Sequence, residues 1–181
     1  MIYVFLADGF EEAEALVTVD ILRRAEIEVT TVGVGKALIE GTHGITVTAD
    51  ITTSEFSLND VTGVILPGGM PGTINLENDK IVLSAIKHAY NNNLLVAAIC
   101  AAPSILGHLG LLKGERATCY PGFEDDLIGA KFVNAPAVTS GNIITAKGAG
   151  AVFEFGFSIT DYVKGNQEIS KNLRETMQCA L

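Results

Sequence analysis

The chain has 181 residues, of which 48% are hydrophobic and only 18% are charged. Twelve basic against twenty-one acidic residues give a formal net charge of −9, which argues against a nucleic-acid or anionic-membrane partner, because both need a basic face. The length predicts one domain over residues 1–181, large enough to bury a core without disulfides or metals.

Short apolar runs alternate with helical patterns along the sequence. Strands are predicted at Ile2–Ala7, Glu28–Val34, Thr42–Thr48, Gly63–Leu66, Leu94–Ile99 and Ile143–Ala146, and helices at Glu11–Arg24, Asp79–Tyr90, Ala151–Val163 and Gln167–Gln178. This alternation predicts an α/β sandwich, with helices on both faces of a mostly parallel sheet. In such sheets the functional site lies where strands end and helices begin.

One stretch is long enough to be tested as a membrane span. Residues Leu94–Leu112 form a run of nineteen without Asp, Glu, Lys or Arg. The run contains Pro103, Gly107 and Gly110, so we interpret it as a strand, a sharp turn and a short helix. The apolar N-terminal segment is short and has no basic leader, which predicts a first strand and not a signal peptide. We therefore expect a soluble protein with no membrane partner.

The cysteines and histidines of the sequence match neither a disulfide pattern nor a metal-site pattern. Cys100, Cys119 and Cys179 are odd in number and make no CxxC pair, so a reducing cytoplasmic location is expected and a disulfide scaffold is not. The three histidines, including His43, are scattered without metal-site spacing, so no metal is expected.

The first candidate site follows the strand Gly63–Leu66, at Pro67, Gly68 and Gly69. Glycines here leave backbone N–H groups uncovered, and such donors can hold an anion or a developing oxyanion. The segment is neither a Walker loop nor a GxGxxG motif. A simple tight turn between strand and loop is the alternative interpretation.

The second candidate follows the strand Leu94–Ile99, which ends directly at Cys100. Small residues and Pro103 then begin a helix, as in a nucleophile elbow that presents one side chain at the edge of a sheet. A helix N-terminus is expected to lower the pKa of this thiol by favouring thiolate. The alternative is an inert core cysteine, because free cysteine is among the most buried residue types.

Three glutamates begin the first predicted helix. Acidic side chains there stabilise the helix dipole, which accounts well for Glu11 and Glu12. Glu14 is flanked by alanines and can turn inward toward the strand ends, whereas Glu12 points elsewhere. A carboxyl group buried beside Cys100 would have a raised pKa and could move a proton, although capping carboxyls are the commoner case.

Together these motifs resemble those of the ThiJ/PfpI superfamily, in particular the branch of the Parkinsonism-associated deglycase (the DJ-one-like branch). The segments that carry the resemblance occur in the same order: Asp8–Glu14, Val19–Ala25, Leu66–Gly69, Ala97–Pro103 and Gly148–Phe155. The resemblance extends from Ile2 to about Gln178. It implies a flavodoxin-like three-layer sandwich, usually a homodimer.

The resemblance also implies roles for individual residues. Cys100 is the expected nucleophile, oxidisable to sulfinate, and Glu14 its protonated partner, while backbone N–H groups of Gly68, Gly69 and Ala101 would form the oxyanion hole. His43 falls where relatives often place an arginine near the partner subunit's site, and a solvated loop histidine is the alternative. Tyr120 falls where deglycase-like relatives often carry a histidine, so it is expected either in the pocket lining or in a hydrogen bond there.

Three functions share this predicted site. The leading one is a cofactor-free cysteine enzyme that converts small 2-oxoaldehydes or removes their adducts. The second is a non-enzymatic redox sensor or stress chaperone that works through oxidation of Cys100. The third is an amidase or peptidase; it is the least favoured, because peptidase-like members place a histidine after the cysteine and Ala101 stands there instead.

Overall fold

The apolar segments form a central seven-stranded sheet in a computed structural model that describes residues 1–179. The strand order is β10-β11-β7-β6-β1-β2-β5, and only the edge strand β10 is antiparallel to its neighbour. The strands are β1 (Ile2–Leu6), β2 (Val29–Gly33), β5 (Ile51–Thr52), β6 (Gly63–Leu66), β7 (Leu95–Ile99), β10 (Ala137–Ser140) and β11 (Ile143–Ala146). The predicted mostly parallel sheet is confirmed.

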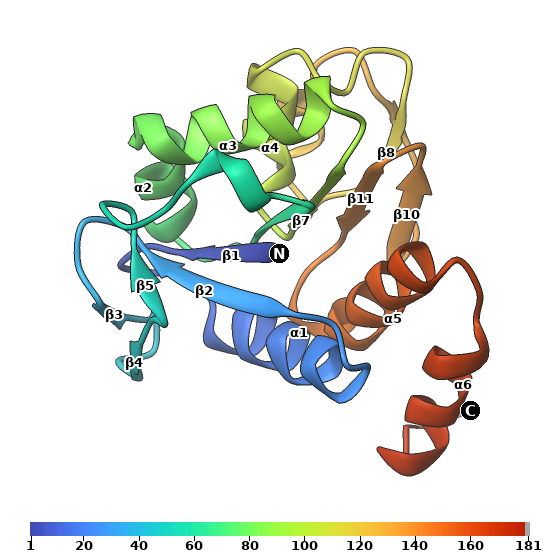
Figure 1. The fold of residues 1–181 in the computed structure, drawn as a ribbon. Coiled ribbons are helices and arrows are strands. Elements are labelled where there is room, and N and C mark those ends of the chain that lie inside the picture. The colour runs from blue at the N-terminus through green and yellow to red at the C-terminus, as the bar shows by residue number, and fades with distance from the viewer. Residues whose placement is uncertain (180–181) are drawn as a thin grey trace.

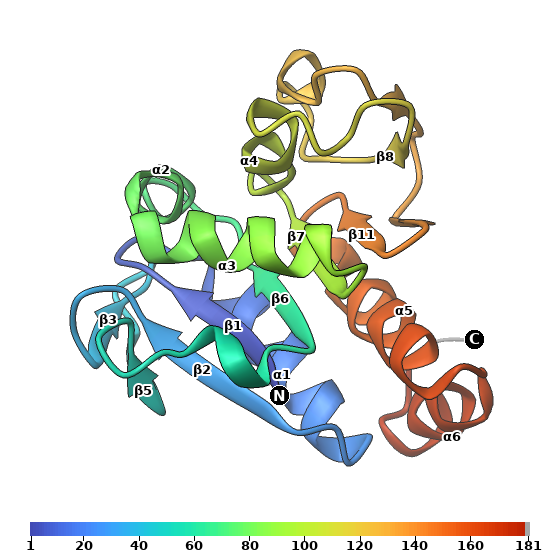
Figure 2. The same cartoon turned by 45° about the horizontal axis from the view of Figure 1, so that its top comes forward.

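Helices cover both faces of this sheet, as Figures 1 and 2 show. One face carries α1 (Glu12–Arg24) and α5 (Val152–Lys164), with α6 (Glu168–Thr176) packed outside α5; the other carries α2 (Gly72–Asn78), α3 (Lys80–Asn91) and α4 (Pro103–His108). Short 3-10 turns lie at Leu58–Asp60, Glu124–Asp126 and Ala149–Ala151. The arrangement is the expected flavodoxin-like three-layer sandwich.

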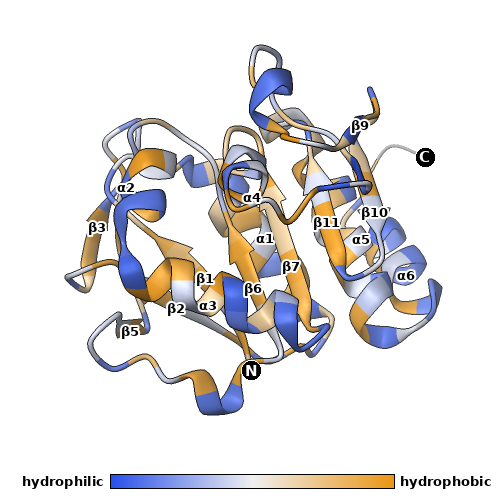
Figure 3. Ribbon diagram, turned by 90° about the horizontal axis from the view of Figure 1, so that it is seen from above, coloured by the Kyte–Doolittle hydropathy of each residue, from blue (hydrophilic) through white to orange (hydrophobic). Residues whose placement is uncertain are grey.

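Two apolar cores lie on either side of the sheet. Alternate residues of β1 contribute to each, with Val4 in the core beneath α1 and α5 and Phe5 in the core beneath α3. All residues of β1, β6, β7 and β11 are buried, and in Figure 3 the central strands are predominantly orange whereas α6 at the periphery is mostly white and blue. Burial on both faces explains why the sequence is so apolar and so sparsely charged.

Outside the central sheet, the chain departs from the sequence-based prediction. The single strand expected at Thr42–Thr48 is wrong: it is shortened to β4 (Thr46–Thr48), which pairs antiparallel with β3 (Leu38–Glu40) in a separate hairpin. Residues 41–45 are instead the loop of this hairpin, bent at Gly44 with φ +80°. Helix α2, strand β10 and the small pair β8 (Arg116–Ala117) and β9 (Lys131–Phe132) were also not predicted.

The uncharged run Leu94–Leu112 folds as the sequence predicted. It forms β7, a turn at Cys100 and the six-residue helix α4. Within residues 1–179, every helix is too short or too polar to cross a membrane.

The topology determines where a site can lie. Strands β1, β6, β7 and β11 are adjacent and parallel, so their carboxyl ends meet at one edge of the sheet. Each end leads into a loop or helix that carries one of the segments singled out in the sequence. Such an edge is where open α/β sheets bind ligands.

Candidate active site

Cys100 occupies the elbow between β7 and the helix that follows. Its φ of +66° is a left-handed conformation that non-glycine residues adopt rarely and that recurs at active sites. The backbone is fixed on both sides, because the Cys100 N–H donates to Ala146 O at 2.9 Å and Cys100 O accepts from the Tyr120 N–H at 2.8 Å. The side chain remains half-buried, which leaves the sulfur within reach of a small ligand.

Glu14 turns into this elbow from the first turn of α1. Its side chain is 1% exposed, its Oε2 accepts the Gly68 N–H at 2.9 Å, and it hydrogen-bonds with the Cys100 thiol. Burial raises the pKa of Glu14 to about 7, even though the bonds to Cys100 and Gly68 favour the charged form. The carboxyl group is therefore able to hold or release a proton near neutral pH.

Glycines 68 and 69 make this close approach possible. A Cβ atom on Gly68 would lie 2.6 Å from the Cys100 Cβ and 2.7 Å from Glu14 Oε2. Gly69 has a φ of +91°, and a Cβ there would lie 2.4 Å from the Glu11 backbone nitrogen. The Pro-Gly-Gly segment is thus more than a turn: side chains at these positions would occupy the space of the Cys100–Glu14 pair and of the chain at Glu11.

The pKa of the Cys100 thiol is raised, whereas the sequence predicted that the helix N-terminus would lower it. Burial and the adjacent Glu14 carboxylate raise the pKa of Cys100 to about 12, and they outweigh the N–H groups of Ala101 and Gly69, which hydrogen-bond to the sulfur and lower it. The helix that follows, α4, has only six residues, and the cost of a second negative charge beside Glu14 exceeds what its N-terminus offers the thiolate.

The expected oxyanion hole needs one correction. The Gly68 N–H is already bonded to Glu14 and is not free to stabilise an oxyanion. The N–H groups of Gly69 and Ala101 hydrogen-bond to the sulfur, so these two donors lie where charge would develop.

The protonation states of Cys100 and Glu14 are coupled: near neutral pH the thiol keeps its proton, and the Glu14 carboxyl group can gain or lose one. A charged Glu14 disfavours thiolate, and a thiolate in turn favours a protonated Glu14, since two negative charges so close together are costly. Transfer of the proton from sulfur to carboxylate generates a thiolate without changing the net charge. The arrangement can therefore supply a nucleophile and an acid–base group together.

Glu12, in the same turn of α1 as Glu14, has a role that the sequence did not predict. Glu12 is 5% exposed and holds the β3–β4 loop: its Oε1 accepts the His43 N–H at 2.7 Å, and its Oε2 lies 2.9 Å from His43 Nδ1. Burial acts to raise the pKa of Glu12, but the hydrogen bonds from His43 and the Ile45 backbone lower it to about 2. The helix-dipole interpretation of Glu12 was incomplete, since its partners lie 31 residues away and no local spacing reveals them.

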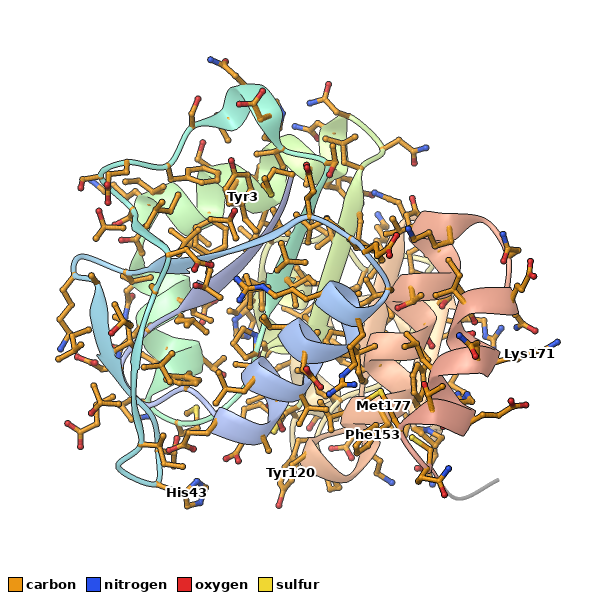
Figure 4. All side chains as sticks on the ribbon, turned by 60° about the horizontal axis from the view of Figure 1, so that its bottom comes forward. Tyr3, His43, Tyr120, Phe153, Lys171 and Met177 are labelled. Atoms are coloured by element: carbon orange, nitrogen blue, oxygen red, sulfur yellow. The ribbon has the colours of Figure 1, made fainter. Side chains whose placement is uncertain are left out.

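His43 is therefore neither a free loop residue nor part of the Cys100 pair. Its side chain is largely exposed, and the contact with Glu12, followed by the charges of Glu11 and Glu12, raises its pKa. Glu11, Glu12 and His43 are also the one group of potential metal ligands within residues 1–179, but they are already bonded among themselves. Figure 4 shows His43 projecting from the hairpin on the same side of the molecule as Tyr120.

Tyr120 borders an open cavity of about 520 Å³. Its ring lies against Gly148, where a Cβ would be 3.2 Å from Tyr120 Cδ2 and 4.0 Å from Glu14 Oε1. The expectation of a pocket-lining residue matches this position, and the described residues give the Tyr120 hydroxyl no protein hydrogen-bond partner.

Cys119 and His108 lie apart from the pair. Cys119 is fully buried in the core on the α3 side of the sheet, where burial raises its pKa to about 11. A ring nitrogen of His108, Nδ1, lies 2.7 Å from Glu77 Oε1, and its Nε2 lies 3.4 Å from Asp126 Oδ1, so His108 connects α4 to α2 and to the turn at Glu124–Asp126.

Known proteins share both the sequence and the fold. The chain is 35% identical over 166 residues to protein DJ-1 homolog B of Arabidopsis thaliana, and these cover 90% of this chain but only 38% of that protein's length. It is 34% identical over 155 residues to a protein of Pyrococcus abyssi named a deglycase, covering 84% of this chain and 92% of the relative. The structure of oxidized Toxoplasma gondii DJ-1 superposes with a TM-score of 0.94 at 30% identity, covering 99% of this chain and 98% of that one.

The model of the DJ-1/PfpI family matches residues 1–162, which span all four strand ends that form the candidate site. The predicted resemblance is confirmed, and the chain belongs to the DJ-1/PfpI family.

Proposed function

We propose that the protein is a cysteine enzyme that converts small 2-oxoaldehydes to 2-hydroxy acids or removes their adducts. The observation that carries this proposal is the buried Glu14 carboxyl group bonded to the elbow thiol of Cys100. A relative named a deglycase supports the same class of reaction. The described residues place no histidine against Cys100, so a cysteine–histidine amidase is not favoured.

In the proposed reaction, the proton of Cys100 passes to Glu14 while the sulfur attacks the aldehyde carbon. Glu14 returns this proton to the aldehyde oxygen, and a hemithioacetal forms. Glu14 then removes the hydrogen of that carbon and delivers a proton to the neighbouring carbon, while the hydroxyl proton of the first carbon moves to the oxygen of the second. The product is a thioester of the 2-hydroxy acid. Water hydrolyses the thioester, which releases the acid and restores the thiol.

The backbone N–H donors of the site can stabilise the negative charge that develops during these steps. Negative charge develops on the oxygen of the attacked carbon, and the N–H groups of Gly69 and Ala101, which lower the pKa of Cys100, are the donors nearest to this position. No oxidant is needed, because one carbon is oxidised as its neighbour is reduced. The pair also keeps one negative charge or fewer during each proton transfer, which a buried site requires.

The test is the formation of lactate from methylglyoxal by the unmodified protein, Cys100→Ser and Glu14→Gln. We expect turnover by the unmodified protein and its loss in both variants. Cys119→Ser is the matched control, because that thiol lies in the core on the other side of the sheet from Glu14. Equal rates in all four proteins would exclude the mechanism.

A second candidate function is a redox sensor or chaperone, in which oxidation of Cys100 is the signal. The half-buried sulfur, with two N–H donors and a protonatable carboxyl group beside it, has partners for the oxygens of a sulfinate. A related structure is described as oxidized. A mass increase of two oxygens at Cys100 in mild peroxide, without aldehyde turnover, would favour this function.

We further propose that the protein forms a homodimer. Leu38 and Ile45 of the hairpin are 57% and 54% exposed, and Leu16 of α1 is exposed as well. The resemblance implies a homodimer, and exposed apolar side chains on the hairpin and α1 are candidates for its interface. Sedimentation equilibrium of the unmodified protein and Ile45→Lys would test it, since a dimer that uses this surface would dissociate in the variant.

A further inference from the structure

The cavity beside the reactive pair contains an unusual charge for so acidic a protein. Its lining includes Tyr120, Asn134, Pro136, Lys147 and Gly148. Within the described part of the chain, Lys147 is the one charged residue of this lining, although the net charge of the sequence is −9. Lys147 therefore gives the wall of this cavity a positive charge.

Lys147 is held in place by its neighbours. Lys147 is half-buried. Its backbone N–H donates to Pro136 O at 3.0 Å, and its Nζ donates to Asn134 Oδ1 at 2.7 Å. Because the lysine occupies the carbonyl oxygen of Asn134, the group of that side chain left for a ligand is its NH₂ donor. The ammonium and the amide thus both offer hydrogens, which suits an acceptor that carries negative charge.

The cation also lies close to the chemistry. Gly148 follows Lys147 directly, and the Cβ position of Gly148 is 4.0 Å from Glu14 Oε1. The remaining lining consists of small or apolar residues, apart from the Tyr120 hydroxyl. Gly148 thus belongs to the cavity lining and also approaches Glu14, so it connects the wall that carries Lys147 to the reactive pair.

We propose that Lys147 and Asn134 bind a carboxylate of the substrate, so that the preferred substrate is a 2-oxoaldehyde with a carboxylate at the far end of a short chain. This inference rests on the proposed function and names its substrate class. The carboxylate takes no part in bond making, and the reaction at the aldehyde proceeds through the same hemithioacetal and thioester.

The test compares two probes, 4,5-dioxopentanoate and the uncharged 2-oxohexanal, in the unmodified protein, Lys147→Met and Lys147→Arg. We expect kcat/KM of the unmodified protein to favour the anionic probe at least tenfold. The preference should fall at least tenfold in Lys147→Met, through KM, and be largely retained in Lys147→Arg. Lys87→Met is the matched control, because this exposed lysine of α3 is not part of the cavity lining and should keep the full preference.

Binding without turnover provides an independent readout. The probe is 4-oxopentanoate, which lacks the aldehyde, and its Kd should rise at least tenfold in Lys147→Met. Turnover of both aldehydes without a preference, or with one that Lys147→Met keeps, would overturn the carboxylate site and leave the proposed function intact. If neither aldehyde is converted, the proposed function fails, and an unchanged Kd for 4-oxopentanoate would then overturn the carboxylate site as well.

Discussion

Glu12 and Glu14 are two residues apart in the first turn of the same helix, and the fold shifts their pKa values in opposite directions. Both side chains are almost fully buried. The pKa of Glu12 is lowered to about 2, whereas that of Glu14 is raised to about 7. Burial alone raises the pKa of a carboxyl group, so burial cannot account for the difference.

The difference lies in what the rest of the chain offers each carboxylate. Glu12 accepts hydrogen bonds from the backbone and imidazole of His43 and from the backbone of Ile45, which together outweigh the cost of burial. Glu14 receives one backbone N–H, from Gly68, and otherwise faces the Cys100 thiol and the charge of Glu11. One carboxylate is thus a permanent anion that holds a hairpin, and the other is a proton carrier.

The largest expected effect is on activity, where the two glutamates should be unequal. Glu14→Gln removes the group that exchanges protons with Cys100, so lactate formation from methylglyoxal should fall by about 100-fold or more. Glu12→Gln makes the same chemical change two residues away and should retain activity within a few-fold. The measurement is kcat/KM for both variants at pH 7.

Folding must be controlled in this comparison, since both residues are buried. Circular dichroism and thermal unfolding of each variant would show whether the protein remains native. A loss of activity of similar size in two folded variants would contradict the assignment of proton transfer to Glu14.

The next effect is on stability and its dependence on pH. The pKa of Glu14 is about 7 in the folded state and 4.5 in the unfolded state, so its stabilising contribution is complete below pH 4.5 and is lost as the pH rises through 7. This corresponds to roughly 3 kcal/mol of free energy of unfolding. Glu14→Gln should therefore gain stability relative to the unmodified protein between pH 4.5 and 8, measured by urea unfolding.

Glu12 provides the opposite control for that measurement. Its pKa is lowered, so its contribution is present above pH 4.5 and is lost only as the pH falls toward 2. The stability difference between Glu12→Gln and the unmodified protein should thus change below pH 4.5. A stability difference for Glu14→Gln that stayed constant from pH 4.5 to 8 would show that the Glu14 pKa is not raised.

A smaller effect on stability is expected when a side chain is added at Gly68, where the backbone lies close to both Glu14 and Cys100. Gly68→Ala places a Cβ 2.6 Å from the Cys100 Cβ and should destabilise the fold by about 1–3 kcal/mol, as overpacking generally does. Gly150→Ala is the matched change, because a Cβ there has no described atom within 4 Å. Equal thermal stabilities of the two variants would mean that the site relaxes around the added methyl group.

The sequence predicted the parts of the site that depend on topology. Cys100, Gly69 and Glu14 follow β7, β6 and β1, and the carboxyl ends of adjacent parallel strands must lie together. It predicted less well where distant segments meet. Neither the hairpin around His43 nor the direction of the Cys100 pKa is encoded locally, since both depend on glutamates brought in by the fold.

The smallest expected effect concerns His43, and it tests whether Glu12 holds the hairpin loop. The hydrogen bond to Glu12 is the main cause of the raised pKa of His43, followed by the charges of Glu11 and Glu12. In Glu12→Gln the His43 pKa should therefore fall toward 6.5, measured by NMR titration of the imidazole, and the amide of His43 should exchange faster with solvent. Glu14→Gln should leave both values unchanged, because Glu14 does not contribute to the His43 shift. An unchanged His43 pKa in Glu12→Gln would mean that the loop holds its position without this carboxylate, and that the two glutamates differ only at Glu14.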